Sequence, residues 1–270
     1  ANTKLLVHGG ASAAIPAVAN TGSSSSAELQ GSAGAKYYEG QVDAVAAVGA
    51  YQDASSSSHA ITAVGDAAIS TTQTRIGTHS IYFDGSGDYL SIPNHSDFDF
   101  GTGDFTIEFS MRLDQLSPKM QILEKRTGGN TGDIQWNIQN DTGGVVEFKI
   151  SNGSSAITVV STAPSVNTWY EVACVRKDDT LGIWMNGTAG NTASTGAGFN
   201  MQVKATDVLI GKSSHSISNF KGYLDEIRIS NSARYTPGTN YTPSGTAFTS
   251  DSNTKLLIHG EVGAASGKIT

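Results

Sequence analysis

Residues 80–114, SIYFDGSGDYLSIPNHSDFDFGTGDFTIEFSMRLD, decide the fold class of this 270-residue chain. Short runs of alternating apolar residues are separated there by Gly, Asp, Asn and Pro, at the spacing of strands and turns. In an extended strand every second side chain points to the same face. The segment DFTIEFSMRL therefore predicts one apolar face that packs into a core, formed by Phe105, Ile107, Phe109 and Met111.

The same pattern continues on both sides of this stretch, from residue 59 to about residue 230. Turn signals recur at intervals of roughly 8–12 residues, and no segment shows a helical period. These features predict an all-β fold, in which two antiparallel sheets stack as a sandwich. The parity of DIQWNIQN places Trp136 in the core, and the same interpretation is favoured for Trp169 and Trp184. Tight hairpins are predicted at Asp84-Gly85, Asn152-Gly153 and Asn186-Gly187.

Composition excludes several classes of partner. The formal net charge is -7 and basic residues do not cluster, which argues against nucleic acid and against an acidic membrane surface. No apolar run reaches the roughly 18–20 residues of a membrane span, so no membrane insertion is expected. No basic segment followed by an apolar run opens the chain, which predicts a mature chain or one made without a leader. Cys174, the one cysteine, has apolar neighbours and is interpreted as a buried small hydrophobe.

The chain divides into three parts by composition. Residues 1–9 and 51–235 are predicted to form the sandwich, and residues 236–270 a C-terminal extension. Residues 10–50 form an insert rich in Ala, Gly and Ser, in which AELQ and KYYEG favour short helical turns. The insert is expected to pack on the sandwich or on a neighbouring subunit.

Four motifs in order carry a family resemblance: FDGSGDYLSIP, FGTGDFTIEFSMR, NTWYEVACVRKDDTLGIWMNG and GYLDEIRIS. Over residues 51–230, with the opening strand NTKLLVHG, the sequence resembles the LamG-like, concanavalin A-type jelly-roll domains. The resemblance implies a module that binds carbohydrate or protein at a cell surface, often with a structural Ca²⁺. Such domains occur in bacterial surface proteins and in phage virion appendages, so an extracellular or virion-surface location is expected.

The resemblance implies binding rather than turnover. Glycoside hydrolysis needs a pair of carboxylates that flank the scissile bond. Glu108 and Asp114 lie too far apart along one strand to form it, while Glu147 and Glu171 each stand alone in the sequence. The chain also lacks a Gly-x-Ser-x-Gly elbow and a His-Glu-x-x-His motif. We therefore expect no enzymatic activity.

Asp225 is one candidate for holding the structural Ca²⁺. In GYLDEIRIS it shares parity with Ile227 and Ile229, which directs its carboxylate toward the interior, where an unpaired charge is costly. In the resembling family this position often helps to hold an ion. Capping of backbone N–H groups in a nearby turn is the equal alternative. Glu226 and Arg228 lie on the opposite face and are interpreted as a surface pair.

Asp84 and Asp88 are the second metal candidates, because Ca²⁺ prefers carboxylate and carbonyl oxygens. They belong to an acidic set whose spacing does not fit an EF-hand and which ordinary turn chemistry explains better. The six histidines show no close pair at ligand spacing, which argues against zinc. The acidic set continues with Asp97, Asp99 and Asp104, and the histidines are His8, His59, His79, His95, His215 and His259.

A ligand surface is expected in loops at one edge of the sandwich, because loops carry function on rigid scaffolds. Residues 125–133 and 211–222 combine polar donors, Gly and an aromatic residue that could stack on a ligand. The alternative interpretation is two hairpin loops without a ligand. The candidate binding residues are Asn130, His215, Asn219 and Phe220.

A repeat has no counterpart in a simple binding module: residues 2–9 read NTKLLVHG and residues 253–260 read NTKLLIHG. The second copy predicts either a further module or a strand that adds to the sheet edge of a neighbouring subunit. Two functions follow. One is a glycan- or surface-binding module, and the other is a structural subunit of a phage appendage, capsid decoration or filament that forms homo-oligomers through its termini and insert.

Overall fold

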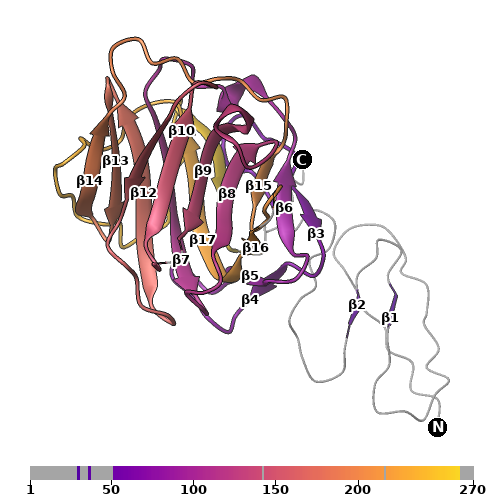
Figure 1. The fold of residues 1–270 in the computed structure, drawn as a ribbon. Coiled ribbons are helices and arrows are strands. Elements are labelled where there is room, and N and C mark those ends of the chain that lie inside the picture. The colour runs from indigo at the N-terminus through magenta and orange to yellow at the C-terminus, as the bar shows by residue number, and fades with distance from the viewer. Residues whose placement is uncertain (1–28, 31–35, 38–50, 142, 216, 262–270) are drawn as a thin grey trace, which may run out of the picture.

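The computed structural model describes residues 29–30, 36–37, 51–141, 143–215 and 217–261. The predicted all-β jelly-roll sandwich is confirmed: two sheets of eight strands stack face to face (Figure 1). Within the insert, β1 (Leu29–Gln30) pairs with β2 (Lys36–Tyr37), although helical turns were predicted for both segments. The remainder of residues 10–50 and the predicted strand in residues 1–9 lie outside the described residues.

The first sheet carries the candidate site. Its strands follow the order β11-β10-β9-β8-β15-β6-β3, and β16 joins the edge of β8 beyond β15. Two short 3-10 helices, η1 (Ser96–Phe98) and η2 (Thr131–Asp133), precede β7 and β9 in the chain. The strands of this sheet are β3 (Thr62–Val64), β6 (Tyr89–Ile92), β8 (Met120–Arg126), β9 (Ile134–Asn140), β10 (Val146–Ser151), β11 (Ala156–Val160), β15 (Val208–Ile210) and β16 (Ser218–Asn219).

The second sheet has the order β14-β13-β12-β7-β17-β5-β4, with β18 paired to β17. Its described strands pair antiparallel, as in a set of hairpins with crossovers. Its strands are β4 (Ala68–Ser70), β5 (Ser80–Asp84), β7 (Phe105–Leu113), β12 (Trp169–Lys177), β13 (Thr180–Met185), β14 (Thr188–Ser194), β17 (Lys221–Ser230) and β18 (Thr254–Ile258).

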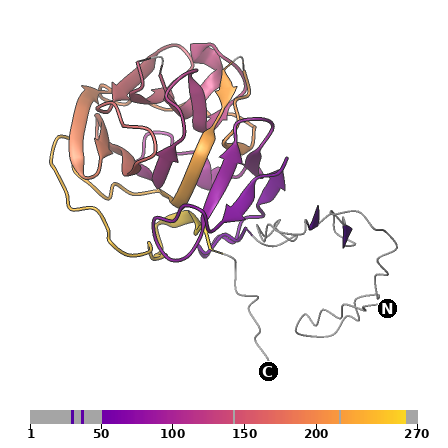
Figure 2. The same cartoon turned by 90° about the horizontal axis from the view of Figure 1, so that it is seen from below.

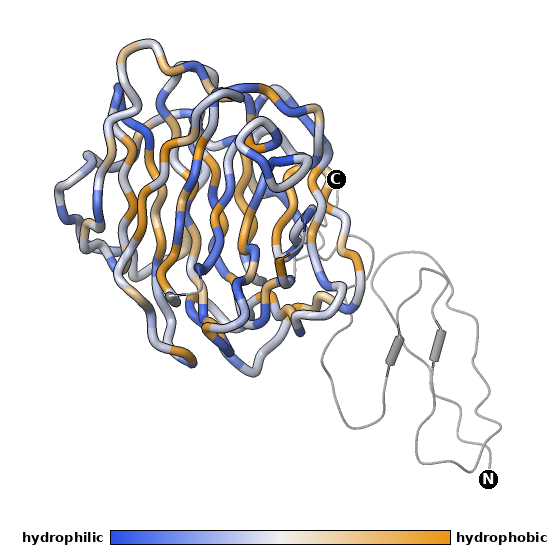
Figure 3. Tube along the Cα trace, viewed as in Figure 1, coloured by the Kyte–Doolittle hydropathy of each residue, from blue (hydrophilic) through white to orange (hydrophobic). Residues whose placement is uncertain are grey.

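The core fills the space between the sheets, and apolar and polar residues alternate along the strands that line it (Figure 3). The predicted apolar face of β7 is confirmed, because none of its four side chains is accessible to solvent. Trp136 is fully buried in this core, whereas Trp184 is fully buried in a smaller cluster on the outside of the second sheet. Cys174 is buried too, and burial raises the pKa of its thiol well above the ordinary value.

The C-terminal copy of the repeated motif forms β18, which pairs with β17 in the sandwich of its own chain. This differs from the expectation that residues 236–270 lie outside the sandwich, and from both alternatives for the copy, a further module or a strand added to a neighbouring subunit. The physical reason is burial: Leu256, Leu257 and Ile258 are each at most 1% exposed, which strongly favours docking within the chain.

The segment between β17 and β18, residues 231–253, runs along the outer face of the second sheet (Figure 2). Tyr235 and Tyr241 stack with ring centroids 3.8 Å apart and cover Trp184. Their hydroxyls donate to carboxylates of the sheet below, Tyr235 to Glu108 and Tyr241 to Glu171, each at 2.8 Å. The chain itself thus closes this outer face. In the described part of the chain, no helix has the length and apolarity needed to cross a bilayer.

Candidate ligand face

The two loops predicted to carry a ligand surface lie against each other. A Cβ atom added at Gly129 would stand 3.3 Å from Cδ2 of His215, so the loop before β9 contacts the loop after β15. Asn130 is exposed at the start of η2, where its backbone N–H donates to Asp133 at 3.0 Å. The structure therefore brings Asn130 and His215 into one region at an end of β8 and β9.

The other two predicted binding residues have structural roles. Phe220 is fully buried in the core, with its ring 5.8 Å from that of Phe83, so it offers no stacking surface. The prediction of a stacking aromatic there is wrong, because Phe220 follows the inward parity at the end of β16. Asn219 is half-buried in β16 opposite Gln121, and its side-chain oxygen accepts from the Ser213 N–H at 3.4 Å.

Below these loops, the outer face of the first sheet presents six polar side chains in two rows of three. We call them the polar face. The cross-strand register sets Glu124 beside Asn137 and Lys149, and Gln121 beside Gln139 and Glu147. Directly opposed residues have Cβ atoms about 4.5–5.5 Å apart, so each row is continuous. A bulge between Gln121 and Leu123 keeps Gln121 and Glu124 on the same face.

The polar face contains most of the unpartnered buried polar atoms found in the described residues. Neither amide atom of Asn137 has a hydrogen-bond partner, although its side chain is inaccessible to solvent. One oxygen each of Gln121, Glu124 and Gln139 is also without a partner. A buried polar atom without a hydrogen bond costs about 1–3 kcal/mol, and such atoms mark functional sites or bound solvent. The concentration on one face therefore points to a ligand or to ordered water.

Glu124 is the electrostatic centre of this face. One carboxylate oxygen accepts the backbone N–H of Ser214 at 2.7 Å. Burial raises the pKa of Glu124 to about 7, and the Ser214 hydrogen bonds and the cations of Arg126 and Lys212 oppose this rise only in part. Near neutral pH the carboxyl therefore exists in both forms and offers either a donor or two acceptors.

The edges of the polar face carry charged groups. Lys149 and Gln139 both contact the same Glu147 oxygen, at 2.9 and 2.6 Å. Burial, with the nearby cations of Arg126, Lys119 and Lys149, lowers the pKa of His215. The imidazole is therefore neutral at pH 7 and both donates and accepts a hydrogen bond. One ring nitrogen, Nδ1, lies 2.9 Å from Oγ of Ser213.

The grouping of the polar-face residues was not predicted, although the alternation along one strand indicates two of them. The alternation that placed Trp136 and Ile138 in the core also directs Asn137 and Gln139 to the outside. Glu147, which stands alone in the sequence, lies in the row of Gln121 and Gln139 because of register. Such a grouping across three strands requires the pairing, which periodicity alone does not give.

The predicted metal residues Asp84 and Asp88 do come together, and Asp66 joins them. Ligand oxygens of the three carboxylates lie within 4.8 Å of one another. Asp88 is 1% exposed and accepts the backbone N–H groups of Asp66 and Asp84, at 2.8 and 2.9 Å. Burial, together with repulsion from the neighbouring carboxylates, raises the pKa of Asp88 to about 6, although the two N–H donors oppose this rise.

Asp225 is buried, at 1% exposed, but its predicted inward direction is wrong: the register pairs it with Ser110, on the face of β7 opposite to the core residue Met111. Its carboxylate accepts three backbone N–H groups, from Ile76, Glu226 and Gly260, at 2.8–3.0 Å. Burial raises its pKa to about 6. These contacts match the capping alternative, and the described residues place no ligand cluster at Asp225. An ion at this carboxylate stays a prediction.

The predicted surface pair of Glu226 and Arg228 is wrong. Both residues are buried, because residues 231–253 cover this face: Glu226 accepts the Phe248 N–H, and Arg228 donates to the Thr249 carbonyl. Arg228 instead bonds Glu108 at 2.8 Å, and Glu226 accepts from Nδ1 of His259 at 2.7 Å. The positive φ of Glu226 and the register shift after Asp225 disturb the alternation on which the prediction rested.

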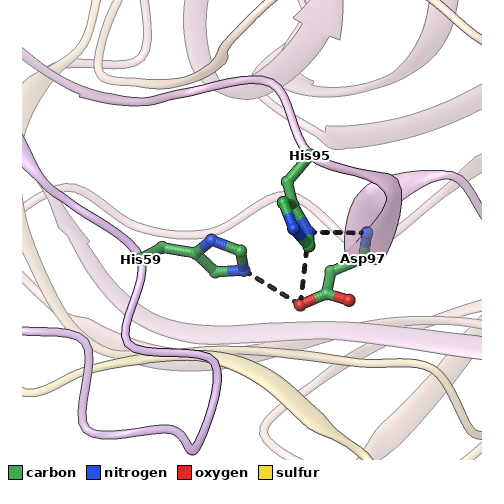
Figure 4. Close-up of side chains that lie close together, drawn as sticks. All are labelled: His59, His95 and Asp97. Atoms are coloured by element: carbon green, nitrogen blue, oxygen red, sulfur yellow. Dashed lines mark hydrogen bonds and ion pairs between the residues drawn. The ribbon is translucent and has the colours of Figure 1, made fainter.

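The histidines also differ from expectation. His59 and His95, 36 positions apart in sequence, lie together with Asp97 so that one ligand atom of each falls within 4.8 Å of the others (Figure 4). Spacing along the sequence therefore did not predict this proximity in space. The fold creates this proximity by placing the loop before β3 beside η1.

The fold is similar to that of several solved structures. The botulinum neurotoxin serotype C1 binding domain superposes with a TM-score of 0.52 and 13% identity, over 68% of this chain and 46% of that chain. The binding domain of botulinum neurotoxin serotype D/C superposes with a TM-score of 0.51 and 13% identity, over 68% of this chain and 46% of that chain. The mouse laminin alpha1 LG4-5 domains superpose with a TM-score of 0.42 and 16% identity, over 60% of this chain and 46% of that chain. The chain thus spans about half the length of the solved chains it matches.

Comparison with curated protein sequences gave no match. A family model for the concanavalin A-like lectin/glucanases superfamily, Laminin_G_3, matches residues 84–236, which is more than half of the chain. This region begins at the end of β5 and includes the polar face, β12 and β17. The chain therefore belongs to the Laminin_G_3 family of the concanavalin A-like lectin/glucanases superfamily.

Proposed function

We propose that this chain is a non-catalytic binding module that recognises carbohydrate through the polar face, outside the cell or on a virion surface. The family description names lectins and glucanases, both of which handle carbohydrate. Sugar hydroxyls both donate and accept hydrogen bonds, so they match a surface of amides and carboxylates. Amide groups on two rows, with Lys149 and His215 at the edges, supply both kinds of partner.

One observation carries the proposal: unpartnered polar atoms concentrate on Gln121, Glu124, Asn137 and Gln139. Their side chains are at most 3% exposed, and the Ser214 N–H holds the overlying loop to Glu124. A ligand therefore reaches them when this loop lifts from the sheet. Its hydroxyls then satisfy groups that already carry the penalty of burial, which favours binding.

The placement of the carboxylates supports binding rather than hydrolysis. Glu124 and Glu147 belong to β8 and β10, on either side of β9, and to different rows. Two strand spacings and a two-residue offset separate their Cα atoms by about 12 Å. Carboxyl groups that hydrolyse a glycosidic bond stand about 5–9.5 Å apart, so these two side chains would reach that spacing only by leaning toward each other. Glu147 is also engaged by Lys149 and Gln139, which leaves it poorly placed as an acid or nucleophile.

A glycan array tests this function, followed by titration calorimetry with the glycan that binds. Lys149→Ala and His215→Ala, both at partly exposed positions, are expected to weaken binding by roughly tenfold or more. Lys177→Ala is the matched control, because this half-buried lysine lies on the second sheet and bonds Thr236. Equal weakening by the control, or no binding to any glycan, would contradict the proposal. Release of reducing ends from a bound glycan would show catalysis instead.

We also propose that the structural Ca²⁺ expected from the sequence binds at Asp66, Asp84 and Asp88. Hard oxygen ligands suit Ca²⁺, and its charge would relieve the repulsion between carboxylates packed within 4.8 Å. The alternative function, a structural subunit that forms homo-oligomers through its termini and insert, stays a prediction. Sedimentation at several concentrations tests it, and a monomer throughout would reject it.

A further inference from the structure

We propose that His59, His95 and Asp97 form a binding site for a divalent transition-metal ion, with Zn²⁺ as the representative. His59 comes from the loop before β3, His95 is the N-cap of η1, and Asp97 lies within η1 (Figure 4). Two imidazoles and one carboxylate are the donor set of many three-ligand zinc sites, in which water completes the coordination. This site lies apart from the polar face and does not depend on the proposed function.

The ligand atoms already have nearly the spacing that zinc requires. Nε2 of His59 stands 3.1 Å from Oδ2 of Asp97, and Nδ1 of His95 stands 3.5 Å from the same oxygen. Zinc bonds of about 2.0–2.1 Å in a tetrahedron separate neighbouring ligand atoms by about 3.3–3.4 Å. The two imidazole nitrogens lie within 4.8 Å of each other, so a rotation of His95 toward His59 would place all three groups around an ion.

The surroundings hold two of the ligands in place. The His59 side chain is 9% exposed, and its ring lies 4.9 Å from that of the buried Phe98. The Asp53 carboxylate accepts the backbone N–H groups of His59 and Leu257, at 2.8 and 2.9 Å, which fixes the loop to β18. Ser57 Oγ donates to the Asp97 carboxylate at 2.7 Å. Hydrogen bonds of this kind orient metal ligands.

His95 is the adjustable ligand. Its side chain is 52% exposed, and Nδ1 accepts the Asp97 N–H in a long hydrogen bond of 3.2 Å. Coordination through Nδ1 replaces this bond, and water can then satisfy the N–H group at the surface. The exposure of His95 leaves solvent access to the ion, and water can complete its coordination.

The donor set discriminates between metals. Imidazole nitrogen suits Zn²⁺ and its transition-metal neighbours, whereas Ca²⁺ takes six to eight oxygen ligands. Two of the three groups here are imidazoles, so Ca²⁺ is disfavoured at this cluster. The acidic cluster of Asp66, Asp84 and Asp88 has the opposite preference, and the two sites are separable by the choice of ion.

Titration calorimetry of Zn²⁺ into the full chain, free of histidine tags and freed of metal with EDTA, tests the site at neutral pH. We expect one Zn²⁺ per chain. His95→Ala, at an exposed position, and Asp97→Asn, which keeps the side-chain shape, should each weaken binding by roughly tenfold or more, because even outer-shell changes cost 10–100-fold. His79→Ala is the control, since this partly exposed histidine pairs with Glu261 outside the cluster.

Three outcomes would overturn the proposal. They are no Zn²⁺ binding at micromolar concentrations, binding that His95→Ala leaves unchanged, and equal weakening by His79→Ala. Co²⁺ gives an independent readout, because its visible absorption reports nitrogen and oxygen ligands directly. We expect Co²⁺ bands that disappear in Asp97→Asn and that excess Ca²⁺ does not displace. Displacement by Ca²⁺ would show an oxygen site and would also reject the assignment.

Discussion

Replacement of Glu124 by Gln should make the protein more stable at neutral pH and should change the pH dependence of its stability. Burial raises the pKa of this carboxyl from the ordinary 4.5 to about 7. Below pH 4.5 the group is protonated in both states. Between pH 4.5 and 7 the unfolded chain loses the proton while the folded chain keeps it, so stability falls as pH rises.

The size of this effect follows from the two pKa values. Their difference of about 2.5, at about 1.4 kcal/mol for each tenfold change in proton affinity, gives about 3 kcal/mol at pH 7 and above. Gln has no charge to bury, and its oxygen can still accept the Ser214 N–H. The variant should therefore match the parent near pH 4 and exceed it by up to about 3 kcal/mol near pH 8.

Urea unfolding of both proteins at steps from pH 4 to pH 8 measures this difference. Glu261→Gln is the contrasting control. Hydrogen bonds from Thr78 and His79 outweigh the effect of burial and lower the pKa of Glu261, so its contribution to stability is lost toward low pH. A difference between Glu124→Gln and the parent that stays constant across the range would refute the reasoning about burial.

Three further predictions concern the core, the acidic cluster and β18. Phe220→Ala should lower the free energy of unfolding by about 3–5 kcal/mol without altering the surface, because the ring is fully buried. The melting temperature of the variant should fall accordingly, and an unchanged melting temperature would contradict the burial of this ring. Ca²⁺ should raise the melting temperature of the EDTA-treated chain but not that of Asp84→Asn, and an equal rise in both would place the ion elsewhere. Deletion of residues 253–270 removes three buried side chains, Leu256, Leu257 and Ile258, whose burial stabilises the fold by about 1.5–3 kcal/mol each. The shortened chain should therefore unfold at a much lower urea concentration. An unchanged midpoint would show that β18 is dispensable.

The fold was predictable because alternation and turn residues are local signals. The apolar face of β7 follows from parity alone. Parity failed at Asp225, because the register shift before Arg228 separates its face from that of Ile227 and Ile229. Residues 231–253 then bury Glu226 and Arg228. Neither the shift nor the cover has a signature in the composition of these strands.

The candidate sites were predictable only in part, because they depend on proximity between distant segments. Asn130 and His215 were named from loops that do meet, and Asp84 and Asp88 lie four residues apart across one turn. The pairing of Asn137 with Glu124 requires strand register. The meeting of His59 with Asp97 requires the path of a loop that Asp53 anchors, and no sequence period encodes it.

The chain contains two nearly identical sequences that could pair with β17, one of which forms β18. Residues 2–9 and 253–260 differ at one position, Val7 against Ile258, and Ile258 is fully buried in β18. One methylene is worth about 0.8 kcal/mol, or roughly a fourfold preference. Only 23 residues (231–253) tether β18 to β17, which gives the C-terminal copy a high effective concentration. Connectivity rather than side-chain recognition therefore decides which copy is bound, and a second chain could compete only at high protein concentration.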